Sequence, residues 1–462
     1  MDVDVAVLGG GPAGYTAAIR AAQLGGSVAC IEAEPRLGGT CLRVGCIPTK
    51  AWVQSAHAYH DARETFSRLG VRTAEPELDF ATVAAWKDAV VDQMTGGVAS
   101  LFKVNGVAWV NGRGTFTGPN TIAVEGAEEV VFKSAIVATG SFPIRPPIPG
   151  LDSPRCVDST GLLAASEVPA RLVILGGGII GCEFASIFNR FGSEVTIVEM
   201  LPHLIPTEDE DAAKELEKAF RKRGITQHLS KQCTQVDDHG SHLTVHFGDG
   251  ETVDCDLMLV SVGRAALVDG VGLEATGVAF DRKGIGTDEH RRTNVPHIYA
   301  VGDVAGYWQL AHTGFREGEV AAENAMGHEA TMGEPAVPRP IYTDPEVAGV
   351  GLTEAQAREV HGDAVVVGRA PWVAIARAVM SGDTTGWVKT IHESTYGELL
   401  GVVIVGPHAT DLIGEAVVAL DAESTIETVA DGVAPHPTLA EGIKEAALVA
   451  LGRAIHLPPR RR

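Results

Sequence analysis

The sequence predicts an α/β protein in which two similar strand–helix–strand units precede a mixed region of strands and helices. The chain has 462 residues, more than one hydrophobic core usually organises, so two to four domains are expected. In addition, residues 5–32 (VAVLGGGPAGYTAAIRAAQLGGSVACIE) and 172–199 (LVILGGGIIGCEFASIFNRFGSEVTIVE) repeat one pattern. Each has an apolar run, a G-x-G-x-x-G turn, a helical stretch and a second apolar run that ends in Glu. Repeated units of this kind favour parallel sheets covered by helices.

The glycines of each unit have separate physical roles. The first allows a tight turn after the strand, the second lets a pyrophosphate approach the backbone, and the third lets the helix pack closely on the strand. The terminal acid lies 23 residues after the first glycine in both units (Gly9 to Glu32, Gly176 to Glu199), where it would accept hydrogen bonds from a ribose. Two Rossmann-like dinucleotide-binding units are therefore predicted. Their glycines are Gly9, Gly11, Gly14, Gly176, Gly178 and Gly181.

The acid of the second unit also indicates which nucleotide binds there. The carboxylate of Glu199 would repel a 2′-phosphate, and residues 200–203 (MLPH) contain no arginine to bind one. This unit is therefore predicted to bind NAD. Two nicotinamides would provide no obvious electron path, so the first unit is expected to bind FAD. Asp303 supports this, because it ends the strand-like stretch of TNVPHIYAVGDVAG (293–306), where a carboxylate can accept a hydrogen bond from a ribityl chain.

The segment GGTCLRVGCIPTK (38–50) sets Cys41 and Cys46 five residues apart. No Cys or His cluster lies nearby to complete a tetrahedral zinc site, so no metal is predicted. In a regular α-helix the Cα atoms of such residues would be over ~8 Å apart, beyond the usual disulfide range. A bond between them therefore requires an irregular turn, which the three glycines and Pro48 supply. We favour a redox-active disulfide over the alternative of two unlinked thiols.

The same segment resembles the redox-active segment of the flavoprotein disulfide reductases, also called pyridine nucleotide-disulfide oxidoreductases. The resemblance extends to VLGGGPAGYTAA, VATGSFP, the second glycine motif, TNVPHIYAVGDV, YTDPEVAGVG and HPTLAE, and so covers nearly the whole chain. Within the family, the sequence is most similar to the dihydrolipoyl dehydrogenases. The second unit carries Glu199 where arginines would favour NADP, HPTLAE is close to the HPTLSE of the lipoyl enzymes, and no C-terminal Cys pair is present.

The resemblance implies roles for residues near the flavin. Cys46 would face the flavin as a charge-transfer thiolate, and Cys41 would be the interchange thiol that attacks the substrate. Lys50 would lie near the flavin N5 and pair with Glu183. Other residues match cofactor-binding positions of the family: Gly140, Gly263, Asp303, Ala311 and His312.

The resemblance also implies that part of the active site comes from a second subunit. His436 and Glu441 match an acid–base pair that the neighbouring subunit contributes, so the active site would require a homodimer. A histidine with a pKa near neutrality can take the proton of a substrate thiol, and an acid can orient it.

The implied domain order follows the family. Residues 1–142 would form the first part of the FAD-binding domain, 143–270 the NAD-binding domain, 271–338 a central segment that completes the FAD site, and 339–462 an α+β interface domain for dimerisation.

The implied reaction oxidises dihydrolipoamide to lipoamide through a Cys41–Cys46 disulfide and FAD, and reduces NAD⁺ to NADH. The implied partner is the lipoyl domain of a 2-oxo acid dehydrogenase or glycine-cleavage complex.

The main alternative is an NAD(P)H-dependent reductase of another small-molecule or protein disulfide, and a non-catalytic flavoprotein is a third possibility. The sequence departs from the family at Arg43, Trp52, Ala434 and the loop after Arg264. Because of these departures, the resemblance does not fix the exact thiol substrate or the structure of the loop on the nicotinamide side.

Composition limits the possible partners and compartments. The net charge of −22 argues against nucleic acid or a membrane surface as a partner, because both present negative charge. No apolar stretch approaches the ~20 residues that span a bilayer. The acidic start MDVD does not fit a signal peptide, and seven cysteines suit a reducing cytoplasm.

Overall fold

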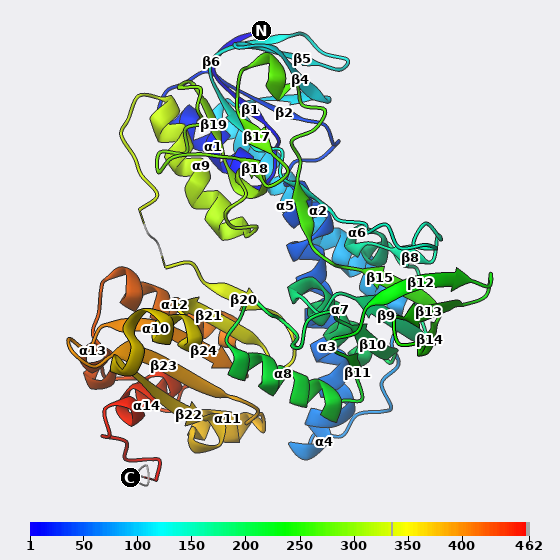
Figure 1. Ribbon diagram of the computed structural model, residues 1–462, viewed down its shortest axis with the longest axis vertical. Coiled ribbons are helices and arrows are strands. Elements are labelled where there is room, and N and C mark those ends of the chain that lie inside the picture. The colour runs from blue at the N-terminus through cyan, green and yellow to red at the C-terminus, as the bar shows by residue number, and fades with distance from the viewer. Residues whose placement is uncertain (334–335, 459–462) are drawn as a thin grey trace.

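The protein was analysed as a computed structural model, which describes residues 1–333 and 336–458 (Figure 1). The N-terminal part of the chain forms the upper body in Figure 1, and the C-terminal part, orange to red, lies at the lower left. Most of the green middle of the chain lies at the lower right. The long helices α3 (Cys46–His60) and α5 (Phe80–Asn105) connect the upper body with the lower two.

The first sheet has the strand order β3-β2-β1-β6-β5-β4, and β19 pairs with β6. Strands β1, β2, β3, β6 and β19 run parallel, while β4 and β5 form an antiparallel extension. All five residues of β2 are buried, as expected for a parallel sheet with both faces covered. The strands are β1 (Asp2–Leu8), β2 (Val28–Glu32), β3 (Ala108–Asn111), β4 (Gly114–Gly118), β5 (Thr121–Val124), β6 (Val130–Val137) and β19 (Ile298–Ala300).

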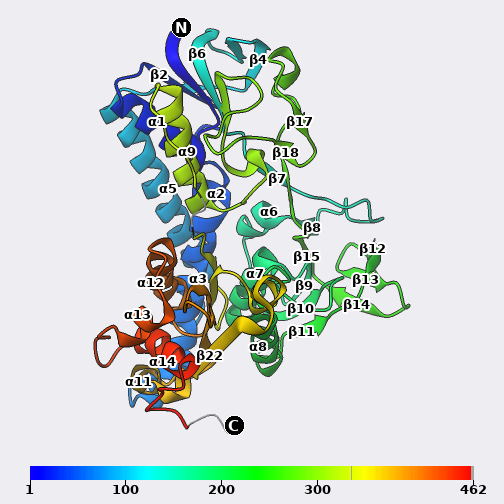
Figure 2. The same cartoon turned by 60° about the vertical axis from the view of Figure 1, so that its left-hand side comes forward.

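Helices α1 (Pro12–Gln23) and α9 (Ala311–Ala325) lie side by side on this sheet, in both Figure 1 and Figure 2. Glycine permits their close approach, because a Cβ on Gly318 would lie 2.4 Å from the carbonyl oxygen of Ala13. The segment that follows the second unit therefore returns to the first unit, through β19 and α9.

The second sheet is parallel throughout, with the order β11-β10-β9-β15-β8. Its strands are β8 (Cys156–Val157), β9 (Arg171–Leu175), β10 (Glu194–Val198), β11 (Thr226–His228) and β15 (Leu257–Val260). Helix α7 (Ile179–Phe191) follows β9, and α8 (Glu210–Lys222) precedes β11. Trp52 of α3 is fully buried against Phe188 and Phe191 of α7. This residue, which departs from the family, is therefore part of the hydrophobic core between the two units.

The third sheet is antiparallel, with the order β20-β21-β24-β23-β22. Its strands are β20 (Arg339–Ile341), β21 (Val347–Gly351), β22 (Val365–Pro371), β23 (Trp387–Glu393) and β24 (Leu399–Val405). Helices α12 (Ala409–Asp421) and α14 (Glu441–Ala450) contact its strands. This arrangement confirms the predicted fold class of two Rossmann-like units and a C-terminal α+β unit. The predicted boundaries after residues 142, 270 and 338 stay predictions.

Buried ion pairs connect the second unit with the C-terminal unit. The ammonium of Lys389, whose side chain is 2% exposed, lies 2.8 Å from Asp209, 2.6 Å from Asp211 and 3.1 Å from Glu354. Arg339 pairs with Glu208 at 3.0 Å. Removing one member of such a group leaves an uncompensated buried charge, so the contacts hold the two units in one orientation.

Candidate active site

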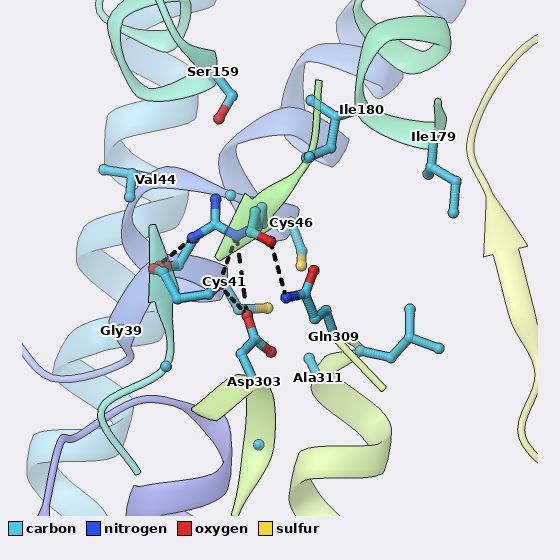
Figure 3. A pocket seen from close by; sticks show the side chains of 18 of the residues that line it. Gly39, Cys41, Val44, Cys46, Ser159, Ile179, Ile180, Asp303, Gln309 and Ala311 are labelled. Atoms are coloured by element: carbon cyan, nitrogen blue, oxygen red, sulfur yellow. Dashed lines mark hydrogen bonds and ion pairs between the residues drawn. The ribbon is translucent and has the colours of Figure 1, made fainter. Parts of the chain in front are cut away.

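A cavity of about 1870 Å³ lies where the two nucleotide units and the cysteine segment meet. Figure 3 shows part of it, with both sulfur atoms of the cysteine pair facing the pocket near Gln309. Most of the predicted site residues line this cavity: Gly9, Gly11, Glu32, Cys41, Cys46, Lys50, Gly140, Gly176, Gly178, Glu183, Glu199, Gly263, Asp303 and Ala311. Segments separated by hundreds of residues in the sequence thus share one site.

The two glycine loops have nearly the same geometry. Gly9 and Gly176 have φ of 108° and 106°, in the left-handed region that favours glycine. A Cβ on Gly14 or Gly181 would lie 1.9 or 2.0 Å from the carbonyl oxygen of the first glycine of its own loop. The first and third glycines of each loop are therefore fixed by the turn and by helix packing, as the sequence predicts.

The acid at the end of each unit supports its own glycine loop. Glu32 accepts the backbone N–H of Gly10 at 2.8 Å, and Glu199 accepts that of Gly177 at 2.6 Å. The second oxygen of each carboxylate accepts the N–H two residues further on, Glu34 and Leu201 respectively. Both acids also line the cavity, where they are placed to meet a ribose.

The loops fit dinucleotides at their second glycines. A Cβ on Gly178 would meet no atom within 4 Å, and one on Gly11 would meet only the Cα of Gly39 at 3.7 Å. Because both residues line the cavity, a side chain there would occupy ligand space rather than protein. The backbone is thus open to a pyrophosphate at both loops, as FAD and NAD require.

The cysteine pair lies on two helices separated by a break. Helix α2 (Gly39–Val44) carries Cys41 and ends before Gly45, whose φ of −141° and ψ of −113° are not helical. Helix α3 then begins at Cys46. This confirms the expected irregular turn. The two thiols are not bonded to each other in this structure.

The two thiols are inequivalent. A hydrogen bond from Cys41 lowers the pKa of Cys46 to about 7; burial and Glu183 oppose this effect, and the charge of Lys50 reinforces it. The same hydrogen bond, together with burial, raises the pKa of Cys41 well above its ordinary value. Cys46 is accessible from the cavity, so a thiolate there can reach a ligand. Near neutral pH the reduced pair carries its negative charge on Cys46.

Lys50 is held by an acid from the second unit. Its ammonium lies 2.8 and 2.7 Å from the two carboxylate oxygens of Glu183, which is 4% exposed. Burial disfavours the charge on Lys50, but Glu183 and Cys46 outweigh burial and raise its pKa. The backbone N–H of Tyr342 donates to Glu183 at 3.0 Å, and the Tyr342 ring lies under the ammonium at 4.6 Å. The predicted Lys50–Glu183 pair is thus present.

A second polar cluster surrounds Asp303. Its carboxylate accepts a hydrogen bond from Ser141, and the guanidinium of Arg264 donates to the side-chain and backbone oxygens of Ser141 at 2.7 and 2.8 Å. Gln309, just before α9, donates to the backbone carbonyl of Arg264 at 3.5 Å. Ser141, Gln309 and Tyr342 are not among the residues that the sequence predicts at this site. A signal was present only for Ser141 and Tyr342, which lie within VATGSFP and YTDPEVAGVG.

The start of α9 faces the cavity. Ala311 is its first residue, and both Ala311 and His312 line the cavity. The Nε2 atom of His312 is 2.9 Å from the carbonyl oxygen of Pro338, and burial lowers the pKa of this histidine. The N-terminal end of a helix favours negative charge, so this end suits an anionic ring system in the cavity.

His436 and Glu441 are paired but lie outside this cavity. The Nδ1 atom of His436 is 2.8 Å from Glu441, whose other oxygen accepts the N–H of Thr438 at 2.9 Å. Burial opposes the charge of Glu441, but the hydrogen bonds from His436 and Thr438 lower its pKa overall. The His436 side chain is 71% exposed, and neither residue lines the cavity. One chain therefore does not bring this pair to the cysteines.

Arg43 forms a salt bridge with an acid that also lines the cavity. Its guanidinium lies 3.1 Å from Glu34, and its side chain is only 18% exposed. A salt bridge at the cavity wall therefore holds this residue, which departs from the family.

Within residues 1–333 and 336–458, no group of three or more His, Cys, Asp or Glu side chains is arranged to hold a metal. None of the helices described in these ranges is long and apolar enough to cross a membrane.

Comparisons with known proteins agree with this geometry. Residues 3–318 match the family described as Pyridine nucleotide-disulphide oxidoreductase, and residues 337–447 match the dimerisation domain of that family. A Bacillus subtilis dihydrolipoyl dehydrogenase is 40% identical over 98% of this chain and 99% of its own length. A mitochondrial dihydrolipoyl dehydrogenase from Pisum sativum is 41% identical over 98% of this chain and 92% of its own length.

Solved structures show the same architecture. The crystal structure of LpdA from Mycobacterium tuberculosis superposes with a TM-score of 0.89 at 28% identity, covering 96% of this chain and 99% of that one. The HOCl-induced flavoprotein disulfide reductase RclA from Escherichia coli, in its Cu(II) complex, gives a TM-score of 0.88 at 29% identity. It covers 97% of this chain and 99% of its own.

Proposed function

Because the chain belongs to the pyridine nucleotide-disulphide oxidoreductase family, we propose that it catalyses the dihydrolipoyl dehydrogenase reaction. It oxidises dihydrolipoamide to lipoamide and reduces NAD⁺ to NADH, with FAD as the resident cofactor. The observation that carries this proposal is the inequivalent thiol pair, set in one cavity between two nucleotide loops. A thiol–disulfide exchange centre between two dinucleotides is what electron transfer from a dithiol to NAD⁺ requires.

The thiol half of the reaction consists of two thiol–disulfide exchange steps at the cysteine pair. A thiolate of dihydrolipoamide attacks Cys41 of the Cys41–Cys46 disulfide, and Cys46 leaves as a thiolate. The second substrate thiol then displaces Cys41 from the mixed disulfide, which releases lipoamide. Two electrons thus reach the protein. Of the two substrate protons, one ends on Cys41, whose pKa is raised, and one is released. The low pKa of Cys46 favours this direction, because a more acidic thiol is the better leaving group.

The cofactors supply the remaining chemistry. A bound FAD would supply the two-electron redox chemistry that connects the thiol pair with NAD⁺. The chain contributes position and charge. Cys46 lines the cavity beside Lys50, whose ammonium stabilises its thiolate, and Glu183 fixes the ammonium in turn. The glycine loops with Glu32 and Glu199 would hold the two nucleotides.

We further propose that His436 and Glu441 act on the cysteine pair of a second subunit. Their separation from the cavity within one chain and the dimerisation domain of residues 337–447 support this. His436 would accept the proton of the substrate thiol, while Glu441 orients the ring through Nδ1. The partner of the homodimer would be the lipoyl domain of a 2-oxo acid dehydrogenase or glycine-cleavage complex. The number of cysteines, seven in 462 residues, supports a reducing compartment such as the cytoplasm.

Purified holoenzyme tests the function directly. NADH formation is followed at 340 nm with NAD⁺ and either dihydrolipoamide or other reduced low-molecular-weight dithiols and monothiols. We expect rapid NADH formation with dihydrolipoamide, and none with that substrate in the matched variant Cys41→Ser. That variant should still pass electrons from NADH to an artificial dye, because the nucleotide sites remain. NADH formation with other thiols but not with dihydrolipoamide would instead favour a reductase of another disulfide.

A further inference from the structure

Lys231 lies at the ribose end of the second nucleotide loop. Its backbone N–H donates to the carbonyl oxygen of Glu199 at 3.0 Å, and the N–H of Ser230 donates to that of Leu201 at 3.0 Å. Lys231 and Glu199 both line the cavity. The lysine side chain therefore starts beside the acid that is proposed to hold the ribose hydroxyls.

The ammonium of Lys231 is already paired with two carboxylates. It forms ion pairs with Asp249 and, at 3.2 Å, with Glu251. Both acids belong to the turn between β13 (Leu243–Phe247) and β14 (Thr252–Cys255).

The turn is built to keep these acids in place. The N–H of Glu251 donates to the carboxylate of Asp249 at 3.2 Å, and the N–H of Gly248 donates to the carbonyl oxygen of Gln232 at 3.0 Å. The lysine side chain is 25% exposed, and those of Asp249 and Glu251 are 43% and 61% exposed. Ion pairs at such exposed positions contribute little to the stability of the fold. Their main effect is to neutralise the positive charge of Lys231.

A lysine at this position would otherwise favour the wrong nucleotide. NADP differs from NAD by a 2′-phosphate on the adenosine ribose, and a free ammonium is a ready partner for a phosphate. Beside Lys231 the cavity wall continues with Met200, Leu201 and Gln232, which carry no charge. Whether this ammonium is free or paired thus changes how strongly the ribose end attracts or repels a 2′-phosphate.

We propose that Asp249 and Glu251 are specificity-determining residues that reject NADP by sequestering Lys231. With Lys231 paired, Glu199, Asp249 and Glu251 leave an excess of negative charge around the ribose end. The proposal rests on the proposed use of NAD. It adds a second source of repulsion against the 2′-phosphate of NADP to that of Glu199. Asp249 and Glu251 act through Lys231, so they position its charge and need not touch the nucleotide.

The test uses holoenzyme and two probes, NAD⁺ and 2′,5′-ADP, with binding measured by isothermal titration calorimetry. The variant Asp249→Asn/Glu251→Gln keeps the size of both side chains and frees Lys231. We expect its affinity for 2′,5′-ADP, relative to that for NAD⁺, to rise about tenfold, which corresponds to about 1.4 kcal/mol. The gain should shrink at high salt, because it is electrostatic.

The matched control adds Lys231→Met to the same variant. If the proposal holds, this third substitution abolishes the gain. An unchanged affinity ratio in Asp249→Asn/Glu251→Gln, or the same gain without Lys231, overturns the proposal. The measurement needs no turnover, so it is independent of the dihydrolipoamide assay. A protein that fails that assay but shows the lysine-dependent gain would refute the proposed reaction and keep the proposed nucleotide selection.

Discussion

The ammonium of Lys50 lies within 2.8 Å of both carboxylate oxygens of Glu183, although 133 positions separate the two residues in the sequence. Lys50 is one turn after Cys46 in α3, and Glu183 belongs to the first turns of α7 in the other nucleotide unit. The pair therefore joins the thiol helix to the NAD unit. It also sets the charge beside Cys46, since Lys50 lowers the pKa of that thiol and Glu183 raises it.

Substitution of Lys50 should make Cys46 a weaker acid. In the reduced wild-type protein, the rate of Cys46 alkylation by iodoacetamide should rise with pH around a midpoint of about 7, because only the thiolate reacts. In Lys50→Met the midpoint should move upward by about one pH unit, since a nearby positive charge is lost. Peptide mass spectrometry at each pH distinguishes labelled Cys46 from labelled Cys41.

The control for this experiment is Lys50→Met/Glu183→Gln, which does not leave a buried carboxylate without its partner. Because Glu183 itself raises the pKa of Cys46, the double variant should have a midpoint between those of wild type and Lys50→Met. A midpoint that stays at its wild-type value in Lys50→Met would show that the ammonium does not stabilise the thiolate.

Hybrid dimers should reveal whether the active site is shared. Cys41→Ala and His436→Gln chains should each be inactive with dihydrolipoamide as homodimers. If His436 serves the other subunit, a heterodimer of the two contains one intact site and one doubly defective site. Random pairing of equal amounts should then restore about a quarter of wild-type activity. Co-expression with two affinity tags isolates the heterodimer. A heterodimer as inactive as its parents would place both groups in one chain's site.

Two glycines of the second loop should respond differently to the same substitution. Gly178→Ala adds a methyl group to open cavity space, so we expect about tenfold weaker NAD⁺ binding. Its thermal stability should stay close to that of wild type. Gly181→Ala places the methyl 2.0 Å from the carbonyl oxygen of Gly176, so this variant should lose about 1–3 kcal/mol of stability. Calorimetric binding and thermal unfolding of both variants test the contrast, and equal effects on both readouts would contradict it.

The sequence alone determined the features that depend on local geometry. The glycine spacing of each loop, its terminal acid and the break between Cys41 and Cys46 follow from backbone constraints within about thirty residues. Such constraints leave a readable pattern, because only glycine adopts the left-handed turns at Gly9 and Gly176 and only a small residue fits at Gly14 and Gly181. The pair of Rossmann-like units can therefore be predicted from the sequence alone.

Only the tertiary structure decided which charges meet. Arg43 pairs with Glu34, Lys231 with Asp249 and Glu251, and Lys389 with three carboxylates from two other segments. The side-chain types are visible in the sequence, but their partners lie on elements that only the packed fold brings together. An ion pair depends on a distance of a few ångströms, and no local spacing rule fixes that distance between distant segments. The unequal acidities of Cys41 and Cys46 are set in the same way, by a hydrogen bond and burial that exist only in the folded chain.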